Sequence, residues 1–235
     1  VYGMFTAIAL SCLTLGKRNK ILWSACSLSL IIFLILSGSR TPFVGIIICL
    51  ATLLILRPTP KAVLAIASAI TCIALAISLK PTLIASSVIS AISDRGLSLR
   101  PEIWQQAWTQ IQAAPWFGHG FDSPMVFWVD SAGQAFADPH NLLLAVWFSG
   151  GIVGLVLWLL LYATCAYFIW KNRNNSLVVL AAATIAFGFA AGMTEGKSFL
   201  SRPKEHWFLL WIPFSILAYA IQKNSVKSAS LKEQS

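Results

Sequence analysis

At 235 residues, with 57% hydrophobic and only 11% charged side chains, the chain is too apolar for a soluble globular domain. Its net charge of +9 comes from lysines and arginines scattered over short connections, without a basic patch interleaved with aromatic residues, which argues against a nucleic-acid-binding protein. We therefore predict an all-α integral membrane protein, built as a polytopic helical bundle.

Seven apolar runs could cross a bilayer as helices, a span that takes about 20 residues, although several must borrow flanking residues. They cover residues 2–15, 21–36, 42–56, 62–79, 142–170, 177–193 and 207–221. These runs divide the chain into transmembrane helices over 1–79, a long loop over 80–140, further transmembrane helices over 141–222 and a tail over 223–235. Because the chain begins at Val1 without the charged lead of a signal peptide, we expect it to be the C-terminal part of a longer protein.

The basic residues predict the orientation in the membrane. When the connections are assigned alternately to the two sides, the side with the tail holds the whole surplus of +9, and the charges on the other side balance. Cytoplasmic connections of membrane proteins carry an excess of Lys and Arg. We therefore predict a cytoplasmic tail and an outward-facing loop over 80–140.

Metal-binding residue types are present, but not in a metal-binding pattern. The five cysteines lie inside apolar runs, with no CxxC pair, and are typical of small core residues. The spacing of His119, His140, Asp122, Asp130 and Asp138 matches no metal motif. We expect neither a metal site nor a disulfide framework.

Arg40 lies in a short polar interruption between the second and third apolar runs. An arginine there is costly to desolvate, so it usually faces a bundle interior, a watery cavity or an anionic partner. The neighbouring Gly38, Ser39 and Pro42 permit the irregular backbone that lines such cavities. The alternative is an arginine that extends to the lipid headgroups.

A helix is predicted inside the long loop, over residues 101–113. Pro101 and Glu102 would occupy its first turn, apolar residues follow at helical spacing, and Pro115 ends it. Its tryptophans, Trp104 and Trp108, favour a position along the membrane interface.

Arg100 immediately precedes this helix. Its guanidinium and the free N–H groups of the helix start would point into the same small volume, a geometry that suits a phosphate group. The alternative is an ion pair with Glu102 or Asp94.

Two glycine-containing segments follow. The aromatic turn Pro115-Trp116-Phe117-Gly118-His119-Gly120-Phe121 follows no strand, so we interpret it as a loop-shaping element and not as a dinucleotide site. The run Gly150-Gly151-Ile152-Val153-Gly154 has GxxxG spacing, which predicts close packing against another helix.

His140 lies where the long loop meets the fifth apolar run. Asp138 followed by Pro139 is typical of a helix N-cap with proline in the first turn, which would put His140 at the helix start, on the membrane surface. The positive end of a helix favours a neutral imidazole, which suits a general base. The alternative is a polar cap without chemistry. A second outward loop over 194–206, which includes His206, could join a site or be a solvated turn.

Taken in order, these segments resemble the O-antigen ligase family, whose superfamily includes O-antigen polymerases and bacterial protein O-oligosaccharyltransferases. The likeness spans residues from about 21 to about 162. It is carried by Ser39-Arg40, Arg100 with Trp104, the 115–121 turn, His140-Asn141-Leu142 and the 150–154 glycines. Family members are usually longer, with additional helices upstream.

The resemblance implies a bacterial inner-membrane glycosyltransferase with its active site facing the periplasm. Such an enzyme moves a glycan from undecaprenyl pyrophosphate to an acceptor hydroxyl, which for the ligase is on a sugar of the lipid A core. Arg40 and Arg100 would bind the pyrophosphate and His140 would be the catalytic base, with no cofactor or metal. These residue types suit the reaction, because transfer from a sugar pyrophosphate needs groups that stabilise the charge of the leaving group and a group that accepts the proton of the hydroxyl.

Other functions remain open from the sequence. Polymerisation of repeat units or protein glycosylation would use the same residues with another acceptor. A flippase for an anionic lipid would need ionisable residues at mid-membrane depth, and the apolar runs hold almost none. A non-catalytic scaffold would not require Arg40, Arg100 and His140 to converge. Glycoside hydrolysis is disfavoured because no paired carboxylates lie near Arg40 or His140 in the sequence.

Overall fold

The computed structural model describes residues 1–16, 19–37, 41–58, 60, 63–64, 67, 99–195 and 207–233. The chain divides into two compact units, each considered by itself below. The first comprises Val1–Val63, Leu159–Gly192 and Ser201–Ser235, and the second comprises Leu64–Trp158 and Met193–Leu200.

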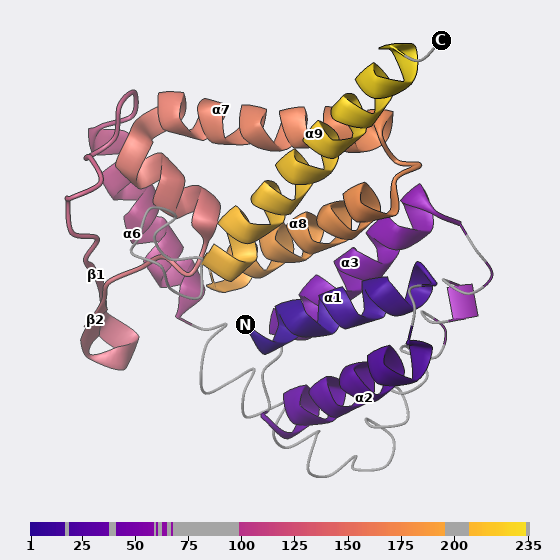
Figure 1. Cartoon of the computed structure of the whole chain (residues 1–235). Coiled ribbons are helices and arrows are strands. Elements are labelled where there is room, and N and C mark those ends of the chain that lie inside the picture. The colour runs from indigo at the N-terminus through magenta and orange to yellow at the C-terminus, as the bar shows by residue number, and fades with distance from the viewer. Residues whose placement is uncertain are drawn as a thin grey trace. The chain divides into compact units, whose positions relative to one another are not determined.

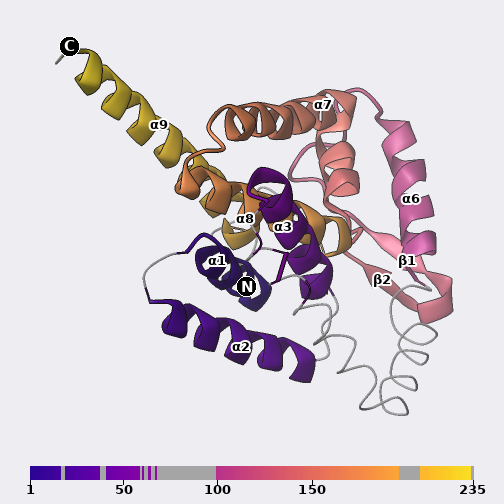
Figure 2. The same ribbon diagram turned by 90° about the vertical axis from the view of Figure 1, so that its right-hand side faces the viewer.

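The first unit begins with three apolar helices, α1 (Tyr2–Thr14), α2 (Lys20–Leu36) and α3 (Thr41–Leu56). They coincide with the first three apolar runs of the sequence. Helix α1 packs against both α2 and α3, and Figures 1 and 2 show it between them.

Small residues let α1 and α3 approach α8 (Ser176–Glu195) closely. A Cβ added to Gly3 would lie 2.7 Å from the ring of Phe187, and one added to Gly45 would lie equally close to the same ring. The glycines therefore make room for one buried aromatic side chain, the kind of small-residue contact that holds membrane helices together.

The end of α7 (Leu142–Lys171), α8 and α9 (Ile212–Glu233) form the other part of the first unit. A π-helical turn, η2 (Trp207–Trp211), leads into α9. Helix α9 continues to Glu233, past residue 222, after which we predicted a tail. The three helices share a buried apolar cluster made of Cys165, Val178, Ala181, Ile185, Leu217 and Ala220.

Two of the described helices, Leu142–Lys171 and Ser176–Thr194, are long and apolar enough to cross a membrane. Helices α1, α2 and α3 are apolar but have only 13, 17 and 16 residues. The predicted run over 62–79 lies almost entirely outside the described residues. Seven crossings therefore stay a prediction, whereas the mainly helical, apolar architecture agrees with the expected class.

The second unit contains α6 (Arg100–Ala113), which begins one residue before the predicted helix and ends where we predicted. A hairpin follows, which the sequence did not predict in an all-α protein: β1 (Phe127–Val129) pairs antiparallel with β2 (Gln134–Phe136). The short 3-10 turn η1 (Asp130–Ala132) and Gly133, at φ 60°, join the strands. Figure 2 shows α6, the hairpin and the start of α7 together.

The inner face of α6 packs against the hairpin. Ile103, Ala107, Phe127 and Val129 are buried in one cluster, and Leu144 from the first turns of α7 packs against it. Ile103 and Ala107 are four residues apart and therefore lie on one helical face, while Phe127 and Val129 share one face of a strand. This small core fixes α6, the hairpin and the start of α7 together.

A polar stripe on α6 also binds the hairpin. Glu102 accepts a hydrogen bond from the backbone N–H of Asp130 (2.8 Å), and Gln110 donates to the carbonyl of Val126 (2.9 Å). Between them, Gln106 donates to the carbonyl of Trp128. Four helical residues rise about 6 Å and two strand residues about 6.6 Å, so the two spacings stay in register.

Helix α7 is broken at Gly151, which has φ 61° and ψ −163°. The 115–121 turn forms hydrogen bonds with the backbone groups at this break. Ile152 N–H donates to Pro115 O (2.8 Å) and His119 N–H donates to Phe148 O (2.8 Å). A Cβ on Gly118 would lie 2.5 Å from Gly151 N, so the two backbones touch. We predicted helix packing for the glycines at 150–154, but Gly151 makes a kink whose neighbouring backbone groups pair with a loop, and among the described residues Gly150 and Gly154 contact no other helix.

Candidate functional site

Asn141, and not Asp138, caps the start of α7. The Asn141 Oδ1 accepts the backbone N–H groups of Leu143 (3.0 Å) and Leu144 (3.2 Å). These are the second and third helical residues, the usual donors to an N-cap side chain. Our prediction that Asp138 is the cap and that His140 lies in the first turn was therefore wrong, because a second good cap residue stands directly before the apolar run.

Asp138 instead contacts His140. The His140 Nδ1 lies 3.0 Å from Asp138 Oδ1, and the same oxygen accepts the His140 backbone N–H at 3.2 Å. The side chains are 26% and 14% exposed, respectively, so the pair is mostly covered but still open to the surface. The rings of His140 and of Phe136 from β2 also contact each other in a T-shaped arrangement, with centroids 6.4 Å apart. Two contacts thus fix the orientation of the imidazole.

The backbone of His140 is left-handed, with φ 48°. Residues other than glycine rarely adopt this conformation, which costs about 1–2 kcal/mol for most side chains. The backbone hydrogen bond to Asp138 and the buried Pro139 hold the residue in this conformation. Strained residues of this kind often occur at functional sites.

Trp104 connects the His140 segment to α6. Its Nε1–H donates to the carbonyl of Pro139 at 2.9 Å. Arg100 and Trp104 are four residues apart and therefore lie on the same face of α6. The face of α6 that carries Arg100 is thus the face that contacts the peptide before His140, and both residues belong to the second unit.

The position of Arg100 is electrostatically informative. It is the first residue of α6, where the positive end of the helix dipole disfavours a cation by a few tenths of a kcal/mol to about 1 kcal/mol. Leu99, the N-cap residue, has no polar side chain to accept the first N–H groups. The charge of Arg100 adds to the positive end of this helix, and a positive potential of this kind favours an anionic ligand. Glu102 is engaged with the hairpin through the Asp130 N–H.

The other predicted site residue cannot be placed. Arg40 lies outside the described residues, and so do residues 196–206 of the second outward loop, including His206. The geometry therefore brings Arg100 and His140 onto connected elements and leaves the position of Arg40 untested.

His119 has a different environment from His140. Its Nε2 lies 2.8 Å from the carbonyl oxygen of Gln110, and its ring stacks on Phe148 with centroids 4.5 Å apart. These contacts join α6 to α7 beside the kink, which agrees with our interpretation of the aromatic turn as a loop-shaping element.

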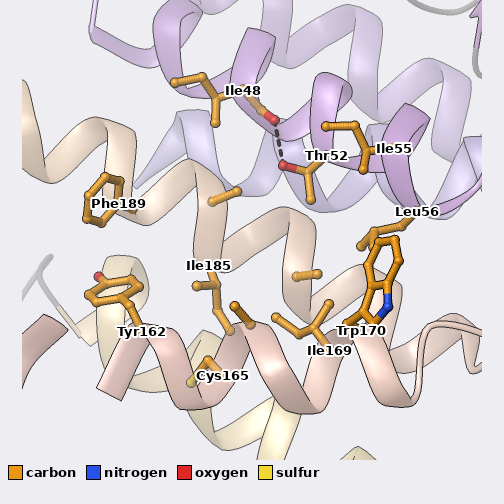
Figure 3. Close-up of a pocket in the computed structure, with 13 residues that line it drawn as sticks. Ile48, Thr52, Ile55, Leu56, Tyr162, Cys165, Ile169, Trp170, Ile185 and Phe189 are labelled. Atoms are coloured by element: carbon orange, nitrogen blue, oxygen red, sulfur yellow. Dashed lines mark hydrogen bonds between the residues drawn. The ribbon is translucent and has the colours of Figure 1, made fainter. Parts of the chain in front are cut away.

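The described residues contain no group of three or more His, Cys, Asp or Glu side chains that could hold a metal ion. A pocket of about 450 Å³ lies in the first unit, between α3, α7 and α8 (Figure 3). Thr52, Tyr162 and Cys165 are polar residues in its lining, and the Thr52 hydroxyl donates to Ile48 O at 2.8 Å within α3. The rest of the described lining is apolar or aromatic, so this pocket lacks the charged groups that a pyrophosphate requires.

The elements that form the candidate site lie within the part of the chain that is similar to known proteins. A family model described as O-antigen ligase matches residues 25–159, which include α6, the hairpin, His140 and the kink. The chain is also 46% identical over 222 residues to an O-antigen ligase from Pseudomonas aeruginosa, an alignment that covers 94% of this chain. It spans 53% of that relative, about half of its length.

The family match covers more than half of the chain, and nearly the same residues carried the resemblance found in the sequence. The long apolar helices α7 and α8 fit a membrane protein of this kind. The chain belongs to the O-antigen ligase family.

Proposed function

We propose that this chain is the part of an O-antigen ligase that holds the catalytic loop. In this proposal the protein lies in the bacterial inner membrane and transfers a glycan from undecaprenyl pyrophosphate to a hydroxyl of the lipid A core. Residues 1–79 and 141–222 supply transmembrane helices, residues 80–140 form the periplasmic loop, and residues from 223 onward face the cytoplasm. The charge asymmetry of the sequence supports this orientation.

The observation that carries the proposal is the contact between His140 and Asp138 on a segment tied to α6, the helix that begins with Arg100. Within the described residues, Nε2 of His140 has no hydrogen-bond partner. A neutral imidazole with one nitrogen held and the other available can accept a proton.

The reaction follows from these groups. The acceptor hydroxyl oxygen bonds to C1 of the donor sugar, and its proton passes to His140 Nε2. The bond between C1 and the pyrophosphate oxygen breaks, and its electron pair leaves with the undecaprenyl pyrophosphate. Arg100, and Arg40 where it reaches the same site, neutralise the charge that grows on the leaving group, in place of a metal ion.

Ligation is favoured over the other reactions of the superfamily because the relative with 46% identity is an O-antigen ligase. Polymerisation or protein glycosylation would differ in the acceptor and not in Arg100 or His140. Transport of a lipid-linked glycan would not require a histidine with an oriented ring.

Substitution of Arg100 by lysine tests the donor site. Lysine keeps the positive charge but loses the planar fork that grips two oxygens. We expect Arg100→Lys in the full-length protein to weaken binding of the undecaprenyl pyrophosphate donor by about 10–100-fold, the loss expected for one charge-assisted hydrogen bond. Binding is measured on purified protein, and O-antigen attachment is measured in cells without their own ligase.

Arg173→Lys is the matched control. Arg173 is exposed, stacks on Trp170 and donates to its carbonyl, and it belongs to the first unit and not to the proposed loop. Its replacement should leave donor binding and attachment unchanged. Normal donor binding by Arg100→Lys would refute the assignment of Arg100, and attachment to an acceptor other than lipid A core would refute ligation.

A further inference from the structure

Asp138 makes contacts that the cap of α7 does not need. Asn141 already accepts the N–H groups of the helix start, so the helix does not depend on Asp138. The Asp138 carboxylate is directed instead to His140, through both the ring Nδ1 and the backbone N–H. These two hydrogen bonds therefore serve the position and orientation of one side chain.

The chemistry of the two groups determines where the proton of His140 lies. An ionised carboxylate only accepts hydrogen bonds, so the 3.0 Å contact requires a hydrogen on Nδ1. A neutral imidazole with hydrogen on Nδ1 has its lone pair on Nε2. The lone pair is then on the nitrogen that, among the described residues, no hydrogen bond occupies.

We propose that Asp138 is a positioning residue that keeps the proton of His140 on Nδ1 and stabilises the imidazolium formed during transfer. This inference rests on the proposed function, in which Nε2 takes the proton of the acceptor hydroxyl. When that proton arrives, both ring nitrogens carry hydrogen, and the positive ring lies against the Asp138 carboxylate. The carboxylate itself stays ionised, as in other histidine–carboxylate pairs.

Asp138→Asn separates this role from a purely structural one. The asparagine side chain would keep an oxygen that can accept the backbone N–H of His140, so the turn should remain. It would lose the negative charge that stabilises the imidazolium. We expect the full-length variant to bind donor normally and to have an unchanged KM for the acceptor, while kcat falls by about 10–100-fold.

Asp130→Asn is the matched control for this substitution. Asp130 is an exposed carboxylate on the same loop, and it contacts α6 through its backbone N–H. Its substitution should leave kcat unchanged. Asp138→Glu, which restores the charge on a longer side chain, should recover part of the activity that Asp138→Asn loses.

The proton position has its own measurement, which does not depend on activity. The ¹⁵N spectrum of histidine-labelled full-length protein distinguishes hydrogen on Nδ1 from hydrogen on Nε2, and His140→Asn assigns the signal. We expect His140 to carry hydrogen on Nδ1, and His119, which faces a carbonyl through Nε2, to carry it on Nε2.

The outcomes separate the two proposals. Hydrogen on Nε2 of neutral His140, or an unchanged kcat in Asp138→Asn, would overturn the role of Asp138 even if His140 is the base. Unchanged transfer in His140→Asn would instead overturn the proposed function and the catalytic part of this inference. The spectrum would then decide whether Asp138 still positions the ring.

Discussion

Two histidines of the second unit lie close to α7, and they differ in the group that each ring contacts. His119 faces the neutral backbone carbonyl of Gln110 and lies flat on Phe148. His140 faces the carboxylate of Asp138 and contacts the ring of Phe136 in a T-shaped arrangement. A carbonyl fixes a ring, whereas a carboxylate also stabilises the ring after it gains a proton. The first histidine is therefore suited to architecture and the second to proton transfer.

The backbone conformations near His119 and at His140 also differ. Near His119, the positive φ angles fall on glycines, namely Gly118, Gly120 and Gly151, and the broken helix pairs its backbone groups with the turn. At His140 the positive φ falls on the histidine itself, at 48°. Glycine would adopt that angle without strain. Strained residues of this kind often occur at functional sites, which supports the role that we propose for His140.

The largest expected effect on folding comes from Gly151→Ala, which changes the kink of α7 beside His119. A Cβ at Gly151 would overlap the backbone of Trp116 and lie 2.5 Å from Phe117 N, in a backbone region that is almost confined to glycine. We expect a loss of at least about 3 kcal/mol, seen as little folded protein after detergent extraction.

Gly150→Ala is the control one residue away. Gly150 lies in the helix, and an added Cβ would meet no described atom within 4 Å. Alanine there should be neutral or stabilising by up to about 1 kcal/mol. Equal yields of folded protein for Gly151→Ala and Gly150→Ala in size-exclusion chromatography would show that the kink does not require glycine at position 151.

Trp104→Phe should give a smaller effect, and one on transfer more than on folding. It removes the Nε1–H that holds the Pro139 carbonyl and leaves an aromatic ring in place. A lost hydrogen bond of about 0.5–1.5 kcal/mol would lower transfer by about 2–10-fold. Trp108 contacts Trp147 ring to edge, and Trp108→Phe should keep near-normal transfer. Equal rates in the two variants would show that the α6 tether does not position His140.

The smallest expected effect is on the polar stripe of α6. Gln106→Ala removes the hydrogen bond to Trp128 O and should lower the thermal stability of the protein by the equivalent of about 1 kcal/mol. Gln105 is exposed on the same helix, and Gln105→Ala should cost no more than a few tenths of a kcal/mol. An equal shift in melting temperature for the Gln106 and Gln105 variants would show that the polar stripe of α6 does not stabilise the hairpin.

Local signals predicted the helices that carry the site. Pro101, Glu102 and the apolar spacing fixed the start of α6, and Pro115 fixed its end to within two residues of Ala113. Such signals act within a few residues, so a sequence alone contains them. The role of His140 was predicted from the resemblance and its place at the end of the loop.

Long-range features were not predictable in the same way. Asp138 and Asn141 both satisfy the preferences of an N-cap, but in the structure Asn141 accepts the N–H groups of Leu143 and Leu144 while Asp138 contacts His140. The glycines at 150 and 151 are equally compatible with packing and with a kink, because the deciding partner is the turn some thirty residues earlier. Strand β1 has 3 residues, too few for a periodic pattern.

The central claim is that His140, and not His119, accepts the proton in glycan transfer. The most direct test measures donor binding and transfer separately on purified full-length protein with His140→Asn or His119→Asn, because asparagine tolerates the left-handed backbone of residue 140. We predict that His140→Asn binds donor normally and loses transfer by about 10²–10⁴-fold, while His119→Asn retains most of its transfer. Transfer near the parent rate in His140→Asn, or a greater loss in His119→Asn, would contradict the account.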